Sequence, residues 1–123
     1  MRTHQVECSF TTGSVPDFVD ITERVQELLD ESRIGAGQVT VFSPSAGCSL
    51  IANERESGLL KDIETTLARL RGPARNGRPT IGSHSLVLPA VGGRLRLGTW
   101  QRVLLVELEA AGSRSVIVQI VGE

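Results

Sequence analysis

Polar and apolar residues alternate from Gln5 to Thr12, which is the period of a half-buried strand. The spacing from Asp17 to Ser32 is instead helical, with Asp20 or Thr22 as the N-cap, and a second amphipathic helix is predicted from Ser57 to Leu70. Further strand-like runs are Gln38–Phe42, Cys48–Ala52, Ser85–Val91, Arg94–Leu97, Arg102–Leu108 and Arg114–Val121. This order of elements has no βαβ rhythm and predicts an α+β fold with a largely antiparallel sheet.

The segment Gly92–Gln101 concentrates turn and aromatic signals. Gly92 and Gly93 lie between two apolar runs, where adjacent glycines supply the positive φ values of a two-residue hairpin turn. Trp100 is the only tryptophan in a chain with three phenylalanines and no tyrosine. We therefore expect a buried indole at Trp100, and at Gln101 an amide at the start of a strand.

Length and composition bound the class of protein. The 123 residues predict a single domain, 1–123, in which Gly72 and Pro73 end the second helix and Ala74–Gly82 forms a basic surface loop. Thirteen basic residues balance 14 acidic ones, which argues against nucleic acid or an anionic membrane surface as a partner. No apolar run is long enough to span a bilayer, so we expect a cytoplasmic protein.

Cysteine and histidine are scarce. Cys8 and Cys48 lie far apart in the sequence, which argues against a disulfide scaffold and a zinc site, and we expect both to be free thiols. His4 and His84 are the two histidines, and neither has a Cys, Asp or Glu at ligand-like spacing. We therefore predict neither a metal site nor a cofactor.

Motifs spread over nearly the whole chain carry a family resemblance: Asp20-Ile21-Thr22, Val39–Pro44, Asn53-Glu54, Gly58–Ile63, Leu88-Pro89, Gly93–Leu95, Leu97–Gln101 and Val118–Glu123. They resemble the YjbQ-like family, whose members are described as secondary thiamine-phosphate synthases. The resemblance implies a β-sandwich-like core with the two amphipathic helices packed outside. It also implies a homotrimer with sites near subunit boundaries.

The chain departs from the family at its histidines. After the proline equivalent to Pro44 the family continues with His-Thr-Thr, whereas this chain reads Ser45-Ala46-Gly47. The family's longer insertion, which carries further histidines, does not fit into the short segment Gly72–Ser85, and His84 does not replace them. The family reaction joins a pyrimidine-methyl diphosphate to a thiazole monophosphate and expels pyrophosphate. Arg94 alone among the matched positions could meet the charge on the leaving oxygens.

Several residues remain as candidates for a pocket. Asn53 and Glu54 match the family's pair next to the site, although they could instead satisfy backbone groups and a helix N-terminus. Arg94 could bind a phosphate or pair with a carboxylate near its turn, and Ser45 and Gln101 complete the candidate ligand-binding set. Cys48 lies in the loop where the family keeps its signature. It is either a nucleophile or a small buried residue.

Three functions stay open, and whether the chain is an enzyme stays open with them. The first is a degenerate YjbQ-like protein whose ancestral type of catalysis is lost or residual. The second is an enzyme or sensor for a small phosphorylated ligand, with a pocket rebuilt from Arg94, Glu54 and Cys48. The third is a non-catalytic trimeric scaffold that binds another protein, which the sequence neither supports nor excludes. Oligomerisation itself is predicted from apolar runs such as Val103–Leu108 and Val116–Val121, which so small a chain cannot easily cover alone.

Overall fold

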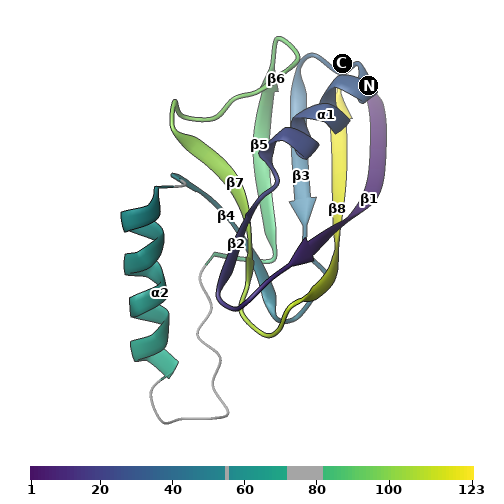
Figure 1. The fold of residues 1–123 in the computed structure, drawn as a ribbon. Helices are drawn as coiled ribbons and strands as arrows, with labels where there is room; N and C mark the ends of the chain where they lie inside the picture. Colours follow the sequence, from purple (N-terminus) through teal and green to yellow (C-terminus); the bar gives the residue numbers. More distant parts are fainter. Residues whose placement is uncertain (55, 72–81) are drawn as a thin grey trace.

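The computed structural model describes residues 1–54, 56–71 and 82–123, and within them it contains eight strands and two helices (Figure 1). The elements are β1 Arg2–Thr12, β2 Asp17–Asp20, α1 Thr22–Ser32, β3 Gly37–Phe42, β4 Cys48–Glu54, α2 Ser57–Arg71, β5 Ser85–Val91, β6 Arg94–Leu95, β7 Gln101–Glu107 and β8 Gly112–Gly122. The α+β prediction is confirmed. The predicted helix end at Gly72-Pro73 and the predicted loop, apart from Gly82, lie outside the described residues.

Five strands form the larger sheet, in the order β1-β8-β3-β5-β6, and all neighbours are antiparallel. Alternate side chains of β3, β5 and β8 enter the main core, where Val39, Leu88 and Val118 are buried. Helix α1 adds Val25 and Leu28 to the same core, because its apolar residues recur on one face. Figure 1 shows α1 lying across β3, β8 and β1 on this inner side of the sheet.

The smaller sheet, in the order β2-β7-β4, forms a middle layer. Leu105 of β7 belongs to the main core, whereas its neighbour Leu104 packs with Phe18, and α2 contributes Leu60 to that second cluster. Both faces of β7 are therefore covered, which explains its continuous apolar sequence. The exposed apolar surface that we expected from Val103–Leu108 does not exist, because residues 103 to 106 are all buried within the chain.

The first helix begins later than the pattern predicted. Residues 17–20 form strand β2, which pairs with residues 104–107 of β7. The N-cap position is Ile21, and Asp20 Oδ1 accepts hydrogen bonds from the backbone N–H and the hydroxyl of Thr22, at 3.0 and 2.7 Å. This correction matters for the site, because strand β2 places Asp20 and the first turn of α1 beside the beginning of β7.

The glycine hairpin is confirmed, and the buried tryptophan is wrong. Gly92 and Gly93 have φ values of 59° and 77° and connect β5 to β6. Trp100 is 73 % exposed, because it lies in the connection between β6 and β7 and not on a core-facing strand position. Gln101 does begin β7, and its Oε1 accepts the N–H of Gly98 at 2.7 Å. Neither helix, in its described residues, is long and apolar enough to cross a membrane.

Candidate functional site

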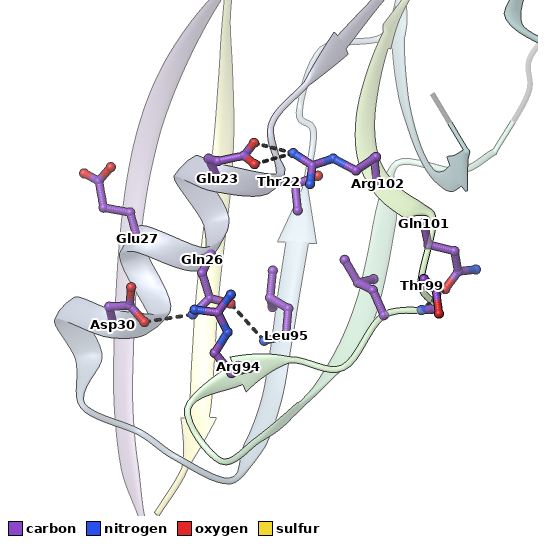
Figure 2. A pocket seen from close by; sticks show the side chains of 12 residues that line it. Thr22, Glu23, Gln26, Glu27, Asp30, Arg94, Leu95, Thr99, Gln101 and Arg102 are labelled. Atoms are coloured by element: carbon purple, nitrogen blue, oxygen red, sulfur yellow. Dashed lines mark hydrogen bonds and ion pairs between the residues drawn. The ribbon is translucent and has the colours of Figure 1, made fainter. Parts of the chain in front are cut away.

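A pocket of about 510 Å³ opens where α1, β6 and the beginning of β7 meet (Figure 2). It is lined by Thr22, Glu23, Gln26, Glu27 and Asp30 of α1, by Arg94 and Leu95 of β6, by Leu97, Gly98 and Thr99, and by Gln101 and Arg102 of β7. The lining therefore combines one face of α1 with four residues of the segment Leu97–Gln101, one of the motifs that carry the family resemblance. We refer to it as the α1–β6–β7 pocket.

Gln26 fixes the geometry of this pocket. Its Nε2 donates to Asp30 Oδ1 at 2.8 Å and to the carbonyl of Gly93 at 3.0 Å, and its Oε1 accepts the N–H of Leu95 at 2.9 Å. One side chain thus fastens the hairpin tip and β6 to α1. As a result, Arg94 lies between two fixed points of the backbone, and both Arg94 and Gln26 line the pocket (Figure 2).

The charges around the pocket are largely paired. Arg102 Nε donates to Asp20 Oδ2 at 2.8 Å, and its Nη2 forms an ion pair with Glu23 (Figure 2). Burial alone would raise the pKa of Asp20, but the hydrogen bonds from Arg102 and Thr22 outweigh it and lower the pKa. Glu27 pairs with Arg24.

Arg94 is different, because its guanidinium makes no hydrogen bond or ion pair within the part of the chain that the structure describes. Asp30 is the other charged residue of the pocket lining that forms no ion pair within the described residues. One of its carboxylate oxygens already accepts a hydrogen bond from Gln26. A guanidinium with free donors matches the geometry of phosphate and carboxylate oxygens. The arrangement can therefore hold a small anion against β6.

The predicted site residues separate into two groups. Arg94 and Gln101 both line the α1–β6–β7 pocket. Asn53 and Glu54 end β4 opposite residues 102 and 101 of β7, so they lie next to the pocket without lining it. Asn53 Oδ1 accepts the N–H of Glu54 at 2.8 Å, which is the backbone role left open for it. Ser45 belongs to the loop before β4, at the other end of that strand.

Cys48 is remote from this group. It begins β4 and is paired with Glu107, whereas Glu54 ends the strand six residues later, about 20 Å away at the rise of an extended strand. Arg94, Glu54 and Cys48 therefore do not share one pocket. Burial and the nearby Glu107 carboxylate raise the pKa of Cys48 to about 11, so the thiol stays protonated at neutral pH. Cys8 and Cys48 are both free, as predicted.

Glu107 is the residue that reasoning from the sequence missed. Its side chain is fully buried, yet its Oε1 accepts the hydroxyl of Thr12 at 2.8 Å and Nε of Arg114 at 2.6 Å. Burial acts to raise the pKa of Glu107, and these hydrogen bonds lower it below its usual range. The sequence signal was weak: an acidic residue closes an apolar strand, with an arginine seven positions later.

The histidines do not converge. His4 is on β1, its Nε2 is buried without a partner, and His84 is an exposed residue just before β5. Strands β8 and β3 separate β1 from β5 in the sheet. The carbonyl of His84 accepts the N–H of Ser43 at 2.7 Å. Among the described residues, no group of three His, Cys, Asp or Glu side chains is placed to hold a metal ion.

Comparison with known proteins agrees with this fold. The family model for UPF0047 protein YjbQ-like matches residues 6–123. A UPF0047 protein of Archaeoglobus fulgidus is 34 % identical over 128 residues, which cover 93 % of this chain and 98 % of the relative. A YbjQ-like protein of unknown function from Sulfolobus solfataricus has a TM-score of 0.90 at 29 % identity, with 99 % of each chain covered. A hypothetical protein of Aeropyrum pernix has a TM-score of 0.88 at 30 % identity, covering 98 % of this chain and 99 % of that one.

Proposed function

The chain belongs to the UPF0047 YjbQ-like family, and from that premise we propose that it binds a small phosphorylated ligand in the α1–β6–β7 pocket without thiamine-phosphate synthase activity. The observation that carries the proposal is the guanidinium of Arg94, which lines the pocket and has no partner within the described residues. The pocket also includes most of the motif Leu97–Gln101, which is one of the motifs that carry the family resemblance.

The proposed absence of catalysis follows from the missing histidines. The family reaction places negative charge on a departing pyrophosphate, and imidazoles are suited to transfer protons near neutral pH. In this chain the loop after Pro44 reads Ser45-Ala46-Gly47. His84 offers one exposed imidazole, and its backbone carbonyl accepts a hydrogen bond from the N–H of Ser43. Cys48 does not substitute for them, because its raised pKa keeps the thiol protonated.

The proposed ligand follows from the charges that remain. Glu23 forms an ion pair with Arg102, and Glu27 forms one with Arg24, so both carboxylates contribute little net negative potential at Arg94. Asp30 stays close, which favours modest affinity and disfavours a ligand with several phosphates. A monophosphate with an apolar body fits best, because Leu95 and Leu97 add apolar surface to the same lining.

Incubation of the purified chain with the pyrimidine-methyl diphosphate and the thiazole monophosphate is expected to give no thiamine phosphate above a protein-free blank. General acid–base catalysis contributes roughly 10²- to 10⁴-fold in rate, and its groups are missing. Chromatography of the products measures the outcome. Turnover that is abolished by the Arg94→Gln variant would show instead that the arginine serves a working synthase.

The Arg94→Gln variant is expected to bind thiazole monophosphate about tenfold more weakly than the wild type, as measured by calorimetric titration. A charge-assisted hydrogen bond in a partly solvated site accounts for about 1.4 kcal/mol, which is that factor. The matched control is Arg96→Gln, because Arg96 is exposed and its Nη1 donates to the carbonyl of Leu97 at 2.9 Å, outside the pocket lining. Equal weakening by both substitutions would mean that the ligand responds to net charge and not to the pocket.

A non-catalytic trimeric scaffold is the second candidate, and we propose a homotrimer for either function. The run Val103–Leu108 does not support it, because residues 103 to 106 are buried within the chain. Support remains in Val116–Val121, where alternate residues such as Ile117 face away from the core. The two groups of candidate residues lie at opposite ends of β4. In a trimer, one group of one copy could lie beside the other group of the next copy.

A further inference from the structure

Arg102 is the second arginine in the lining of the α1–β6–β7 pocket, and its guanidinium is shared between two carboxylates. Its Nε donates to Asp20 Oδ2 at 2.8 Å, whereas its Nη2 pairs with Glu23 (Figure 2). The side chain of Asp20 is 20 % exposed and is also bonded to Thr22, but that of Glu23 is 78 % exposed. An ion pair with so exposed a partner contributes little, so Glu23 is the weaker of the two attachments of Arg102.

The two arginines of the lining are attached to neighbouring positions on α1. Arg102 is bonded to Glu23, and the backbone on both sides of Arg94 is bonded to Gln26. Glu23 and Gln26 are three residues apart, so they lie on the same face of the helix, about 4.5 Å apart along its axis. A ligand group held by Arg94 therefore lies within the reach of a second long side chain that lines the same pocket.

We propose that Arg102 is a second phosphate-binding residue of this pocket, and that Glu23 occupies its Nη2 until a ligand displaces the carboxylate. A phosphate monoester presents three terminal oxygens. The guanidinium of Arg94 donates to two of them, which leaves the third for Nη2 of Arg102. Nε of Arg102 stays on Asp20, and the released Glu23 is solvated in its exposed position. This inference rests on the proposed ligand binding and adds the contact that limits its affinity.

The exchange favours phosphate monoesters over carboxylates. A carboxylate has two oxygens, and the guanidinium of Arg94 can satisfy both. Such a ligand has no oxygen left for Arg102, and Glu23 stays paired. A phosphate monoester has the third oxygen and carries a charge of about −1.5 to −2 at pH 7, so it competes better for Nη2. Glu23 thus acts as a selectivity element, because it opposes every anion and only a phosphate compensates for its displacement.

Calorimetric titration with thiazole monophosphate tests the proposal through the variant Glu23→Gln. This substitution leaves Nη2 of Arg102 without a charged partner, so the variant is expected to bind about threefold more tightly than the wild type. The matched control is Glu27→Gln, which removes the same charge from the same pocket lining. Its partner Arg24 lies outside the lining and keeps Glu31 at 3.9 Å, so the affinity should change by less than about 1.5-fold.

The variant Arg102→Lys separates an exchange of partners from a simple removal of charge. Lysine keeps the positive charge, but its single ammonium should stay with Asp20, the more buried carboxylate. Glu23→Gln made in the Arg102→Lys background should therefore leave the affinity unchanged within about 1.5-fold. Both glutamine variants change exposed side chains, so the comparison between Glu23→Gln and Glu27→Gln stands even if Arg102→Lys does not fold.

The outcomes distinguish this inference from the proposed function. The inference is overturned if Glu23→Gln binds no more tightly than Glu27→Gln, or if it still tightens binding in the Arg102→Lys background. An equal gain for a carboxylate analogue of the same thiazole would also overturn it. In each of these cases, weaker binding by Arg94→Gln would still support the proposed function. A wild type that does not bind thiazole monophosphate overturns both.

Discussion

Replacing Glu107 by glutamine is expected to lower the free energy of unfolding by about 3 kcal/mol at pH 7, because it removes the charged partner of Arg114 from a fully buried position. The glutamine has the same shape, but its amide has one acceptor oxygen where the carboxylate has two. Thr12 Oγ1, Arg114 Nε and the N–H of Glu109 all donate to the carboxylate. Part of this set would be left unsatisfied.

The substitution also has a signature in pH. The folded pKa of Glu107 lies below its unfolded value, so its contribution to stability is complete above the unfolded pKa of about 4.3 and is lost as the pH falls through the folded pKa. The difference between wild type and Glu107→Gln should therefore shrink in acid. Asp20, whose pKa is also lowered, keeps part of the acid dependence in the variant. Urea unfolding at pH 7 and pH 3 measures both effects.

Glu54→Gln is the matched control for this experiment. Glu54 is an exposed residue at the opposite end of the same small sheet, so its substitution should change stability by less than about 0.5 kcal/mol. A cost for Glu107→Gln no larger than that of the control, or a difference that grows as the pH falls, would contradict the structural role assigned to the buried carboxylate.

Most of the sheet could be predicted from local pattern. Strands β1, β3, β5 and β8 alternate or carry β-branched residues between turn signals, and these cues need no knowledge of the partner strand. The helical pattern failed at residues 17–20, because a four-residue strand is too short to establish a period of two. Its partner β7 lies more than 80 residues away. Pairing over that distance decided the conformation.

The pocket was only partly predictable for the same reason. Arg94 and Gln101 are close in sequence and were both identified as ligand-binding candidates, and the structure places both in one lining. Other contacts of the pocket join residues that no local motif connects. Arg102 pairs with Asp20, and Gln26 accepts the N–H of Leu95 after the hairpin turn. Trp100 shows the converse error, since rarity of a residue type carries no information about its burial.

Strand β7 shows how one pattern can support two opposite expectations. A continuous apolar run is compatible with a surface that needs a partner, as well as with a strand buried on both faces. The structure distinguishes them, because Leu105 packs into the main core and Leu104 packs toward Phe18 and α2. Each leucine has no exposed surface. The two positions are therefore equal in burial but differ in what surrounds them.

That difference gives the largest stability effects that we expect. Leu105→Ala should cost about 4 kcal/mol, because its cavity would lie between the two sheets, which are fixed by their hydrogen-bond ladders and can collapse only slightly. Leu104→Ala should cost about 3 kcal/mol, because Leu60 and Ile63 of α2 are only partly buried and can move into the space. Chemical denaturation of both variants measures the pair. Equal costs, or a larger cost at Leu104, would mean that α2 is fixed as rigidly as the main core.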